Sequence, residues 1–342
     1  MQINKDKKGK KKGIIKKALI FVFFQIMAIL ITGPTLIYCG PFQHLKSIVA
    51  QSAYTSSSFV FLTKMYMSDA SINKMMGNDN DAKNAFISNS KGNLVKIKKS
   101  KSSDVDLLEV KGRKFKGLAI VVDDPKRLKT GYTDKLKKEG QSTSEIAKEN
   151  DAFAAINGGG FFTSDDSSEV AWTGAGGTPK GVIISNGELI FADSLDYDKK
   201  NDVAAFTDKG ELLVGLYSYN ELKDKKVKEA ICFGPALLIN GKKTVLGDYG
   251  GWGIAPRTAV GQKRDGSVVL LVLEGRKLNS VGATLEDVQD IMLKLGVVNA
   301  TNLDGGYSTT MYYGGQVINK PYNVLGERAV PTILYVEKKK KK

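Results

Sequence analysis

The sequence predicts an α+β fold: a mixed, largely antiparallel, curved β-sheet core with a few flanking helices and one N-terminal transmembrane helix. Three observations support this prediction. Between residues 90 and 337, short apolar runs rich in Val, Ile and Leu alternate with Gly, Asn and Asp turn signals, which is typical of many short strands. Helical periodicity is confined to a few stretches. The one long apolar run lies near the N-terminus, and 342 residues are ample to bury a large core.

The N-terminal sequence is typical of a membrane anchor. Residues 1–17 hold eight lysines and one aspartate, and residues 18–38 are mostly apolar. A bilayer crossing needs about 20 residues, and a lysine block stays on the cytoplasmic side. We therefore expect a basic cytoplasmic tail (1–17), a single-pass signal anchor in the cell membrane (18–38), and the rest of the chain outside the cell. The alternative is a cleaved signal peptide, although no small-x-small cleavage site follows cleanly.

The net charge of +15 is concentrated at the two ends of the chain. The N-terminal tail carries +7, and the segment 337–342, which includes a lysine tail at 338–342, carries +4. The residues between them carry only +4. A nearly balanced middle argues against a nucleic-acid partner.

Histidine and cysteine are too scarce for several kinds of site. The single histidine, His44, lies next to the apolar segment, and the two cysteines, Cys39 and Cys232, are far apart in the sequence. A disulfide framework, a thiolate metal cluster and a histidine-dependent triad are therefore not expected. Acid or base chemistry would fall to carboxylates, Lys or Tyr.

The chain between the anchor and the C-terminus divides near residue 90. We expect a helical stalk or linker over 39–89, because its apolar residues have loosely helical spacing and it ends in a polar, turn-rich stretch. The main domain is expected over 90–337. Its predicted elements are two strands joined by a Lys-Gly-Arg turn (105–133), a helix (142–151), a buried strand that runs into three glycines (152–160), an Asn-Gly hairpin (179–191), a long buried strand (265–276) and a helix with Thr284 at its N-cap and Gly296 after its end (284–296).

Polar side chains interrupt apolar strands at four places, each where a strand stops. These places are Asn157 with its glycines, Arg257, Glu274 with Arg276, and Asn302 with Asp304. The Asp-Gly pair at 304–305 has two interpretations: a hairpin turn, or the floor of a pocket in which glycine lets backbone approach a ligand.

The arginines favour a pocket that binds an anion. Lysine supplies 45 of the 51 basic residues, yet three of the six arginines, Arg257, Arg276 and Arg328, fall in the motif-bearing segments. A planar guanidinium holds an oxyanion by two parallel hydrogen bonds. The alternative is that each arginine forms a buried ion pair with Glu274, Asp304 or Glu327.

A series of motifs resembles the bacterial phosphodiester glycosidase family, which is related to the lysosomal enzyme that removes N-acetylglucosamine from its phosphodiester to mannose. The motifs cover about residues 90–337, and the anchored layout is similar to forms often labelled exopolysaccharide biosynthesis proteins. Two residues depart from the family pattern: Glu274 stands where Asp is usual, and Tyr307 where Gly or Ser is frequent. The motifs, in order, are "INGGGFF", "PKGVIISNGEL", "FGPALLINGK", "APRTAVGQ", "LEGR", "VGATLEDVQDIMLKLG", "NATNLDGGYSTTMYYGGQVIN" and "ERAVPT".

The resemblance implies cleavage of the bond between a sugar C1 and a phosphate oxygen, through an oxocarbenium-like transition state that a carboxylate stabilises. Catalysis would then rest on Asp304 as nucleophile or general base and on Glu274 as its partner. The residues that would bind phosphate or sugar, directly or through backbone N–H groups, are Arg257, Arg276, Asn157, Gly158, Gly159, Asn302, Gly305, Gly306, Ser308, Thr309 and Arg328.

The expected partner is a phosphodiester-linked glycan, such as a cell-envelope polysaccharide or a teichoic-acid-like polymer. No cofactor is required, although a divalent cation such as calcium could bind near the carboxylates. A non-catalytic module that binds phosphorylated glycans would have the same features. A metal-dependent phosphodiesterase would need clustered Asp or His ligands, which the sequence does not offer.

Overall fold

The computed structural model describes residues 3–41, 46, 49–50, 53, 60–68, 71, 95, 105–162, 176–245, 252–277, 279–322 and 326–339. The predicted domain boundary at residue 90 and most of the predicted stalk lie outside these ranges. The division of the chain into tail, anchor, stalk and main domain therefore stays a prediction.

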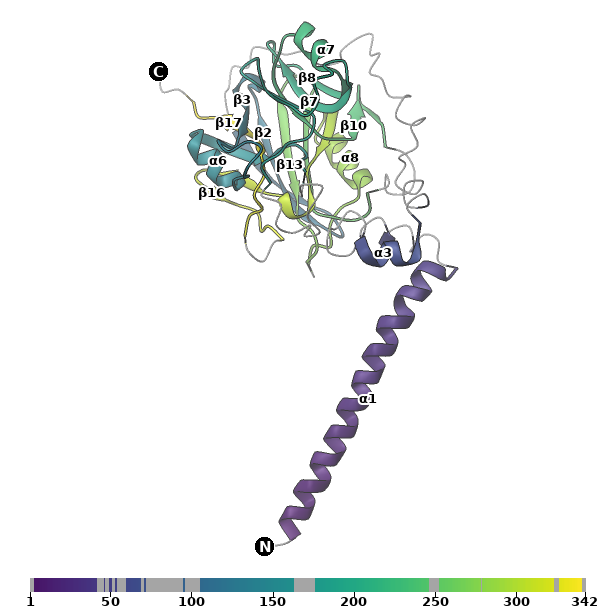
Figure 1. Ribbon diagram of the computed structural model, residues 1–342. Coiled ribbons are helices and arrows are strands. Elements are labelled where there is room, and N and C mark those ends of the chain that lie inside the picture. The colour runs from purple at the N-terminus through teal and green to yellow at the C-terminus, as the bar shows by residue number, and fades with distance from the viewer. Residues whose placement is uncertain are drawn as a thin grey trace.

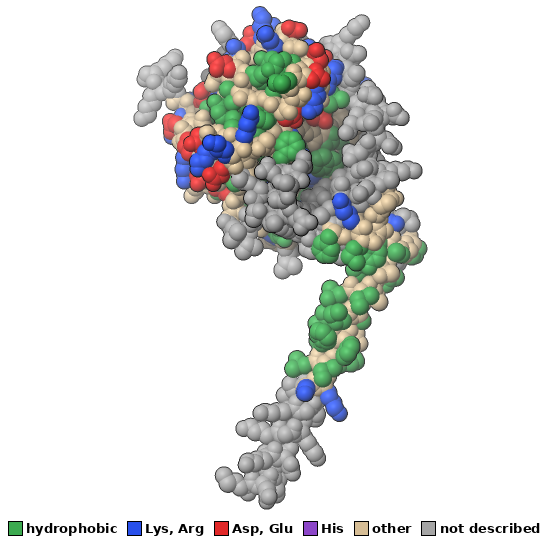
Figure 2. Space-filling model, viewed as in Figure 1, with side chains coloured by type: hydrophobic (Ala, Val, Ile, Leu, Met, Phe, Trp, Pro, Cys, Tyr) green, Lys and Arg blue, Asp and Glu red, His purple; other side chains and the backbone are tan. Residues whose placement is uncertain are grey.

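Helix α1 (Ile3–Cys39) extends away from the globular part of the protein as a single rod (Figure 1). Its segment Lys16–Cys39 is long and apolar enough to cross a membrane, and hydrophobic side chains cover it on the face seen in Figure 2. At its end, Tyr38 stacks on Tyr66 of α3 (Val60–Tyr66), with ring centroids 5.0 Å apart. Length and composition make α1 a candidate membrane span, and the direction in which it would cross stays a prediction.

Three antiparallel sheets make up the globular part. The largest has the order β1-β2-β13-β12-β14-β10-β11, the second β16-β15-β4-β17-β3 and the third β6-β5-β9-β7-β8. The strands are β1 (Val105–Lys111), β2 (Lys116–Val122), β3 (Leu128–Tyr132), β4 (Ala152–Asn157), β5 (Val182–Ser185), β6 (Glu188–Ala192), β7 (Asn201–Thr207), β8 (Leu212–Tyr217), β9 (Val227–Cys232), β10 (Ala236–Ile239), β11 (Lys242–Lys243), β12 (Arg257–Lys263), β13 (Val268–Leu273), β14 (Val297–Leu303), β15 (Met311–Tyr313), β16 (Gln316–Val317) and β17 (Thr332–Glu337).

The three sheets share one apolar core, to which each contributes one face. Val260 and Leu303 come from the first sheet, Ile156 from the second, and Phe206 and Ile231 from the third. Outer faces are covered by short helices that lie on three sides of the molecule in Figure 1: α8 (Leu285–Lys294) on the first sheet, α6 (Thr143–Glu149) on the second and α7 (Tyr219–Asp224) on the third. The α+β prediction is confirmed, with antiparallel sheets that do not close into a barrel.

Local signals in the sequence placed several elements correctly. Thr284 caps α8, and its hydroxyl and the Asp287 carboxylate form a reciprocal capping box. Gly296 follows with a φ of +82°. The Asn186-Gly187 turn joins β5 to β6 with both residues at positive φ, as a two-residue hairpin requires. The long strand expected over 265–276 is shorter, because β13 begins only after the turn at Gly266 and ends before Glu274.

Candidate active site at the crossover between two sheets

The segment 304–310 connects two different sheets. β14 ends at Leu303 in the seven-stranded sheet, and β15 begins at Met311 in the sheet that contains β4. Between them lies one short 3-10 turn, η3 (Gly306–Ser308). β15 pairs with β4 and β16 and not with β14, so the hairpin interpretation of Asp304-Gly305 is wrong. The crossover instead carries Asp304 to the junction of the two sheets.

Asn157, at the end of β4, fixes the crossover in place. Its Nδ2 donates to the carbonyl of Asp304 at 2.5 Å. Its Oδ1 accepts from the Thr258 hydroxyl at 2.8 Å and from the backbone N–H of Thr310 at 3.1 Å. The side chain is fully buried, and its amide is occupied by partners from both sheets. This geometry gives Asn157 a positioning role.

The glycines around Asp304 allow backbone segments to pack unusually closely. A Cβ on Gly158 would lie 2.5 Å from the Thr332 hydroxyl, and one on Gly305 would lie 2.8 Å from the carbonyl of Pro256. Their neighbours' N–H groups are already used within the protein: Gly159 donates to Thr332 Oγ1 and Gly306 to the carbonyl of Pro256. These glycines therefore shape the crossover through close packing.

The carboxyl group of Asp304 is held in a site that opposes its ionisation. Burial raises its pKa above the ordinary Asp value, whereas the Ser308 hydroxyl, the Arg328 guanidinium, the Gly305 N–H and the Lys180 ammonium act in the opposite direction. Its Oδ2 atom is buried and makes no hydrogen bond of normal length with a described residue. One oxygen of this carboxyl group is thus not committed to holding the fold together.

Unpaired buried polar atoms gather along this segment. Of the eight such side-chain atoms in the described part of the chain, five belong to residues 302–310. An unpaired buried polar group costs about 1–3 kcal/mol, so a cluster of them calls for partners such as water, an ion or a ligand. The five atoms are Asn302 Oδ1, Asp304 Oδ2, Ser308 Oγ, Thr309 Oγ1 and Thr310 Oγ1.

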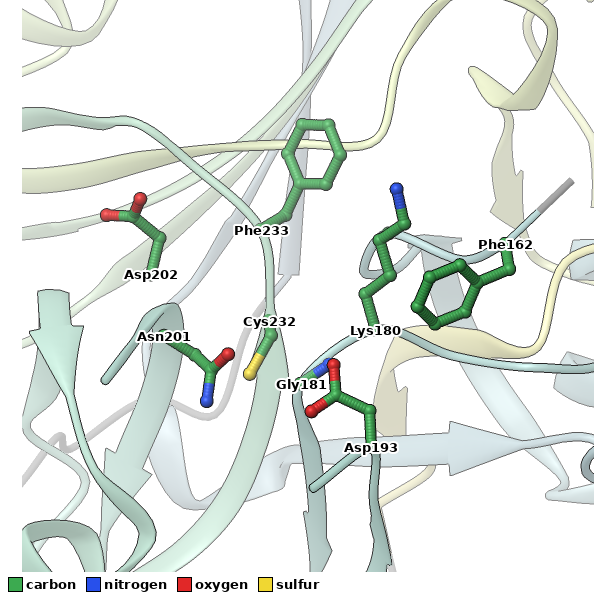
Figure 3. A pocket seen from close by; sticks show the side chains of 9 residues that line it. Phe162, Lys180, Gly181, Asp193, Asn201, Asp202, Cys232 and Phe233 are labelled. Carbon is green, nitrogen blue, oxygen red and sulfur yellow. The ribbon is translucent and has the colours of Figure 1, made fainter. Parts of the chain in front are cut away.

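Three cationic side chains lie around the crossover, each against aromatic rings. The Arg276 guanidinium lies against both Tyr307 and Tyr322, 5.1 and 5.5 Å from their ring centroids, and its Nη1 is 3.7 Å from where a Gly306 Cβ would stand. Arg328 lies 4.8 Å from the ring centroid of Phe161, and Lys180 lies 5.1 Å from that of Phe162 (Figure 3). Burial lowers the pKa of Arg276. The arrangement favours an anion beside Asp304.

Arg257 is used differently from Arg276. Its guanidinium is buried, with Nε donating to the carbonyl of Ala283 and Nη2 to those of Trp252 and Gly253. Burial lowers its pKa to about 9. None of the arginines 257, 276 and 328 forms an ion pair with Glu274, Asp304 or Glu327, all of which the structure describes. Arg257 instead holds together the loops at the end of β12.

Glu274 lies at the same edge of the sheet as Asp304, but both oxygens of its carboxylate already have partners. Its Oε1 accepts from the Lys320 N–H at 2.7 Å, and its Oε2 pairs with Lys277 Nζ at 3.1 Å. β12 lies between the two strand ends, with Arg257 opposite Leu273 and Thr258 opposite Leu303. Two strand spacings separate the backbones by about 10 Å. The two strand ends lie at the same end of the sheet, and no hydrogen bond links the two carboxyl groups.

Several residues at the crossover were not singled out from the sequence. Lys180 lies in the motif "PKGVIIS" but is one of 45 lysines, and Tyr322 lies outside the motifs. Thr310 was visible only as one of three neighbouring hydroxyl residues. No group of three or more His, Cys, Asp or Glu side chains in the described ranges is arranged to hold a metal ion, so we assign no metal ligands.

Comparison with known proteins identifies a family. The phosphodiester glycosidase family model matches residues 150–337. The chain is 43% identical over 68 residues to bovine N-acetylglucosamine-1-phosphodiester alpha-N-acetylglucosaminidase, covering 20% of this chain and 13% of that one. It is 27% identical over 206 residues to the SPbeta prophage-derived uncharacterized protein YomE of Bacillus subtilis, covering 56% and 29%. The chain thus spans less than a third of the length of these relatives.

A solved structure shows the same fold. The catalytic domain of zebrafish N-acetylglucosamine-1-phosphodiester alpha-N-acetylglucosaminidase, auto-inhibited by its pro-peptide, aligns with a TM-score of 0.57 at 22% identity, covering 73% of this chain and 85% of that one. The family model covers more than half of the residues, including every strand end that forms the crossover site. This chain therefore belongs to the phosphodiester glycosidase family.

Proposed function

We propose that this protein is a membrane-anchored, extracellular hydrolase that cleaves the C1–O bond of a sugar linked through phosphate to a cell-envelope glycan. The observation that carries the proposal is the Asp304 carboxyl group: its Oδ2 atom is buried without a hydrogen bond of normal length, and the charges of Arg328 and Lys180 act on it. Family membership supports the class of reaction.

Asp304 would act on the sugar carbon. Cleavage at C1 develops positive charge on the sugar ring, which an adjacent carboxylate stabilises either as nucleophile or as general base for water. A phosphate group leaves far more readily than a sugar hydroxyl, so little proton donation is needed. This chemistry suits a site in which the charges that act on the Asp304 carboxyl group, those of Arg328 and Lys180, are both positive.

The phosphate would be held by Arg276, Lys180 and Arg328. Arg276 is oriented by two tyrosine rings that contact it and each other, and a planar guanidinium can bond two phosphate oxygens at once. The hydroxyl groups of Ser308 and Thr309 and the Oδ1 atom of Asn302 would form hydrogen bonds with the substrate. These groups lie on one short segment and are buried, so a substrate would bond several of them only if the segment moved to admit it.

The remaining candidate residues would position the reacting groups. Asn157 and the glycines at 158, 159, 305 and 306 fix the backbone of Asp304. Arg257 holds the loops at the end of β12. Glu274 holds the segment at Lys320, two residues before the tyrosine that packs on Arg276.

The fate of the water oxygen tests the reaction. The full chain in detergent micelles is incubated with an N-acetylglucosaminyl phosphodiester in ¹⁸O-labelled water, and the released phosphate monoester is examined by ³¹P NMR. We expect turnover with no label in the phosphate, because the C1–O bond breaks. Label in the phosphate would show P–O cleavage and refute the mechanism. Binding without turnover would support a non-catalytic glycan-binding module.

A further inference from the structure

Helix α3 packs beside the last turns of α1 and lies crosswise to it in Figure 1. The stacked rings of Tyr38 and Tyr66 are nearly parallel, at an angle of 7°. The hydroxyl oxygens of Tyr38 and Thr63 are 3.1 Å apart, and those of Thr35 and Tyr66 are 3.3 Å apart. Thr35 and Tyr38 are three residues apart, so they project from the same side of α1. The position of α3 is therefore tied to one side of the end of α1.

These contacts place α3 at the level where α1 would leave a membrane. The apolar part of α1 begins after Lys17, and about 20 helical residues cross the hydrocarbon layer of a bilayer, so that layer would end near Ile37. Thr35 lies within one helical turn of that point. Tyr66, whose hydroxyl group contacts Thr35, would accordingly lie at the boundary between acyl chains and head groups. Tyrosine is enriched at this boundary because its ring is apolar and its hydroxyl group is polar.

The opposite side of α3 is apolar and exposed. Phe61 and Met65 are four residues apart and share one side of the helix, with 58% and 71% of their surface exposed. With about 100° of rotation per residue, this side is turned about 150° away from Thr63 and Tyr66, which contact α1. Because α1 contacts α3 laterally, the exposed side faces outward in the plane of the membrane. That is the direction in which lipid would surround the two helices.

The bilayer offers this exposed pair an apolar environment. Removal of a Phe or Met side chain from water contributes about 1.5–3 kcal/mol, and the acyl chains would begin at the level of Tyr66. Phe61 and Met65 can therefore leave water without any further protein partner. Leu195, in the loop between β6 and β7 of the third sheet, is also apolar and is 91% exposed. It serves as a comparison on the globular part.

We propose that α3 is an interfacial helix, which lies at the membrane boundary beside the end of α1 and inserts Phe61 and Met65 among the upper parts of the lipid acyl chains. The partner is the lipid, bound through its apolar layer. α1 and α3 would then attach the globular part to the membrane at two adjacent points. This proposal rests on the membrane anchor of the proposed function and is independent of the catalytic part.

Spin labels in lipid vesicles test the proposal. The full chain with Cys39→Ser is reconstituted in vesicles of phosphatidylcholine and phosphatidylglycerol. Cys232 stays unlabelled because it is buried and burial raises the pKa of its thiol to about 12. A nitroxide is attached at Phe61→Cys or Met65→Cys, and its collisions with oxygen, which dissolves in lipid, are compared with those with a nickel chelate, which stays in water. We expect oxygen to relax both labels severalfold more than the chelate does.

Two further labels calibrate the result. Leu30→Cys, within the candidate span, should show the same preference for oxygen, and Leu195→Cys should show the reverse. Labels on α3 that behave like the one at Leu195, or that neither reagent reaches because a second copy or another protein surface covers them, would overturn the proposal. A preference for the chelate at Leu30 as well would overturn the membrane anchor itself. The measurement uses no substrate, so it does not depend on whether the protein is a hydrolase.

The unsubstituted chain provides a second test if the labelled variants fail to fold. Vesicles are prepared with a phosphatidylcholine that carries a photoreactive diazirine near the ester end of one acyl chain, and lipid adducts are located by mass spectrometry after illumination. We expect adducts on Phe61 or Met65 as well as on α1. Adducts on α1 with none on α3 would overturn the proposal and leave the anchor and the proposed reaction standing. Adducts on neither helix would overturn the anchor.

Discussion

The ends of β13 and β14 lie at one edge of the same sheet, on either side of β12, and a carboxylate follows each. After β13, both oxygens of Glu274 are bonded, one to a backbone N–H and one to Lys277. After β14, Asp304 Oδ2 is buried with no described hydrogen-bond partner. Two carboxylates at equivalent strand ends therefore differ: one stabilises a loop, and the other has an oxygen without a described hydrogen-bond partner. The two side chains differ in whether their carboxylate oxygens have hydrogen-bond partners.

Replacing the available carboxylate should have the largest effect. Asp304→Asn keeps the shape and removes the charge, and carboxylates that act in the chemical step contribute about 10²–10⁴-fold. We expect kcat on a sugar phosphodiester to fall by about a thousandfold, with a melting temperature no lower than that of the wild type, because no hydrogen bond to Oδ2 is lost. Wild-type turnover by this variant would show that Asp304 has no chemical role.

The next largest effect should come from the arginine beside the crossover. Arg276→Lys keeps the positive charge but loses the planar fork and the contacts of the guanidinium with two tyrosine rings. We expect KM to rise about tenfold, which corresponds to about 1.4 kcal/mol, with a smaller change in kcat. Arg264→Lys, in the turn between β12 and β13, is the control. Equal kinetics of the two variants would remove Arg276 from the phosphate site.

The pH dependence should separate activity from stability. Burial raises the pKa of Asp304, so its charged form, which the reaction needs, appears only as the pH rises through this raised value. kcat should therefore fall on acidification at a pH above the ordinary Asp pKa. A raised folded-state pKa also means that stability is lost as the pH rises through that value. The melting-temperature advantage of Asp304→Asn over the wild type should accordingly grow as the pH rises above the ordinary Asp pKa; a constant difference would contradict the account.

The smallest effect on catalysis is expected after β13. Glu274→Gln removes the ion pair with Lys277 and weakens the bond to the Lys320 N–H. Loss of a part-buried hydrogen-bonded charge costs about 1–3 kcal/mol, so the midpoint of thermal unfolding should fall. kcat should stay within about threefold of the wild type, because neither oxygen is free for substrate. A kcat loss comparable to that of Asp304→Asn would make Glu274 a catalytic partner after all.

Short sequence motifs were sufficient to predict part of the fold. The N-cap at Thr284 and the Asn186-Gly187 turn are determined by adjacent residues, and both were predicted. The course of the chain after Asp304 was not, because Asp-Gly suits a hairpin as well as a crossover. Only the pairing of β15 with β4, about 150 residues earlier, decides between them.

The site was predicted in the same uneven way. Asn157, Asp304 and Arg276 were chosen for residue type and place, and the structure brings Asn157 against Asp304 and Arg276 against Gly306. The sequence could not show that the Arg257 guanidinium would donate hydrogen bonds to three backbone carbonyls. Nor could it separate Lys180 from the other lysines, since its importance comes from the effect of its charge on Asp304, which lies far away in the sequence.

Chemical rescue tests the contrast between the two carboxylates most directly. Asp304→Ala and Glu274→Ala are assayed on the same sugar phosphodiester with increasing sodium formate, with sodium chloride at equal ionic strength as the control. A small carboxylate can replace a missing reactive group only where that group faced the substrate. The account predicts that formate raises kcat/KM of Asp304→Ala at least tenfold and leaves Glu274→Ala unchanged. Rescue of Glu274→Ala alone, or of neither variant, would contradict it.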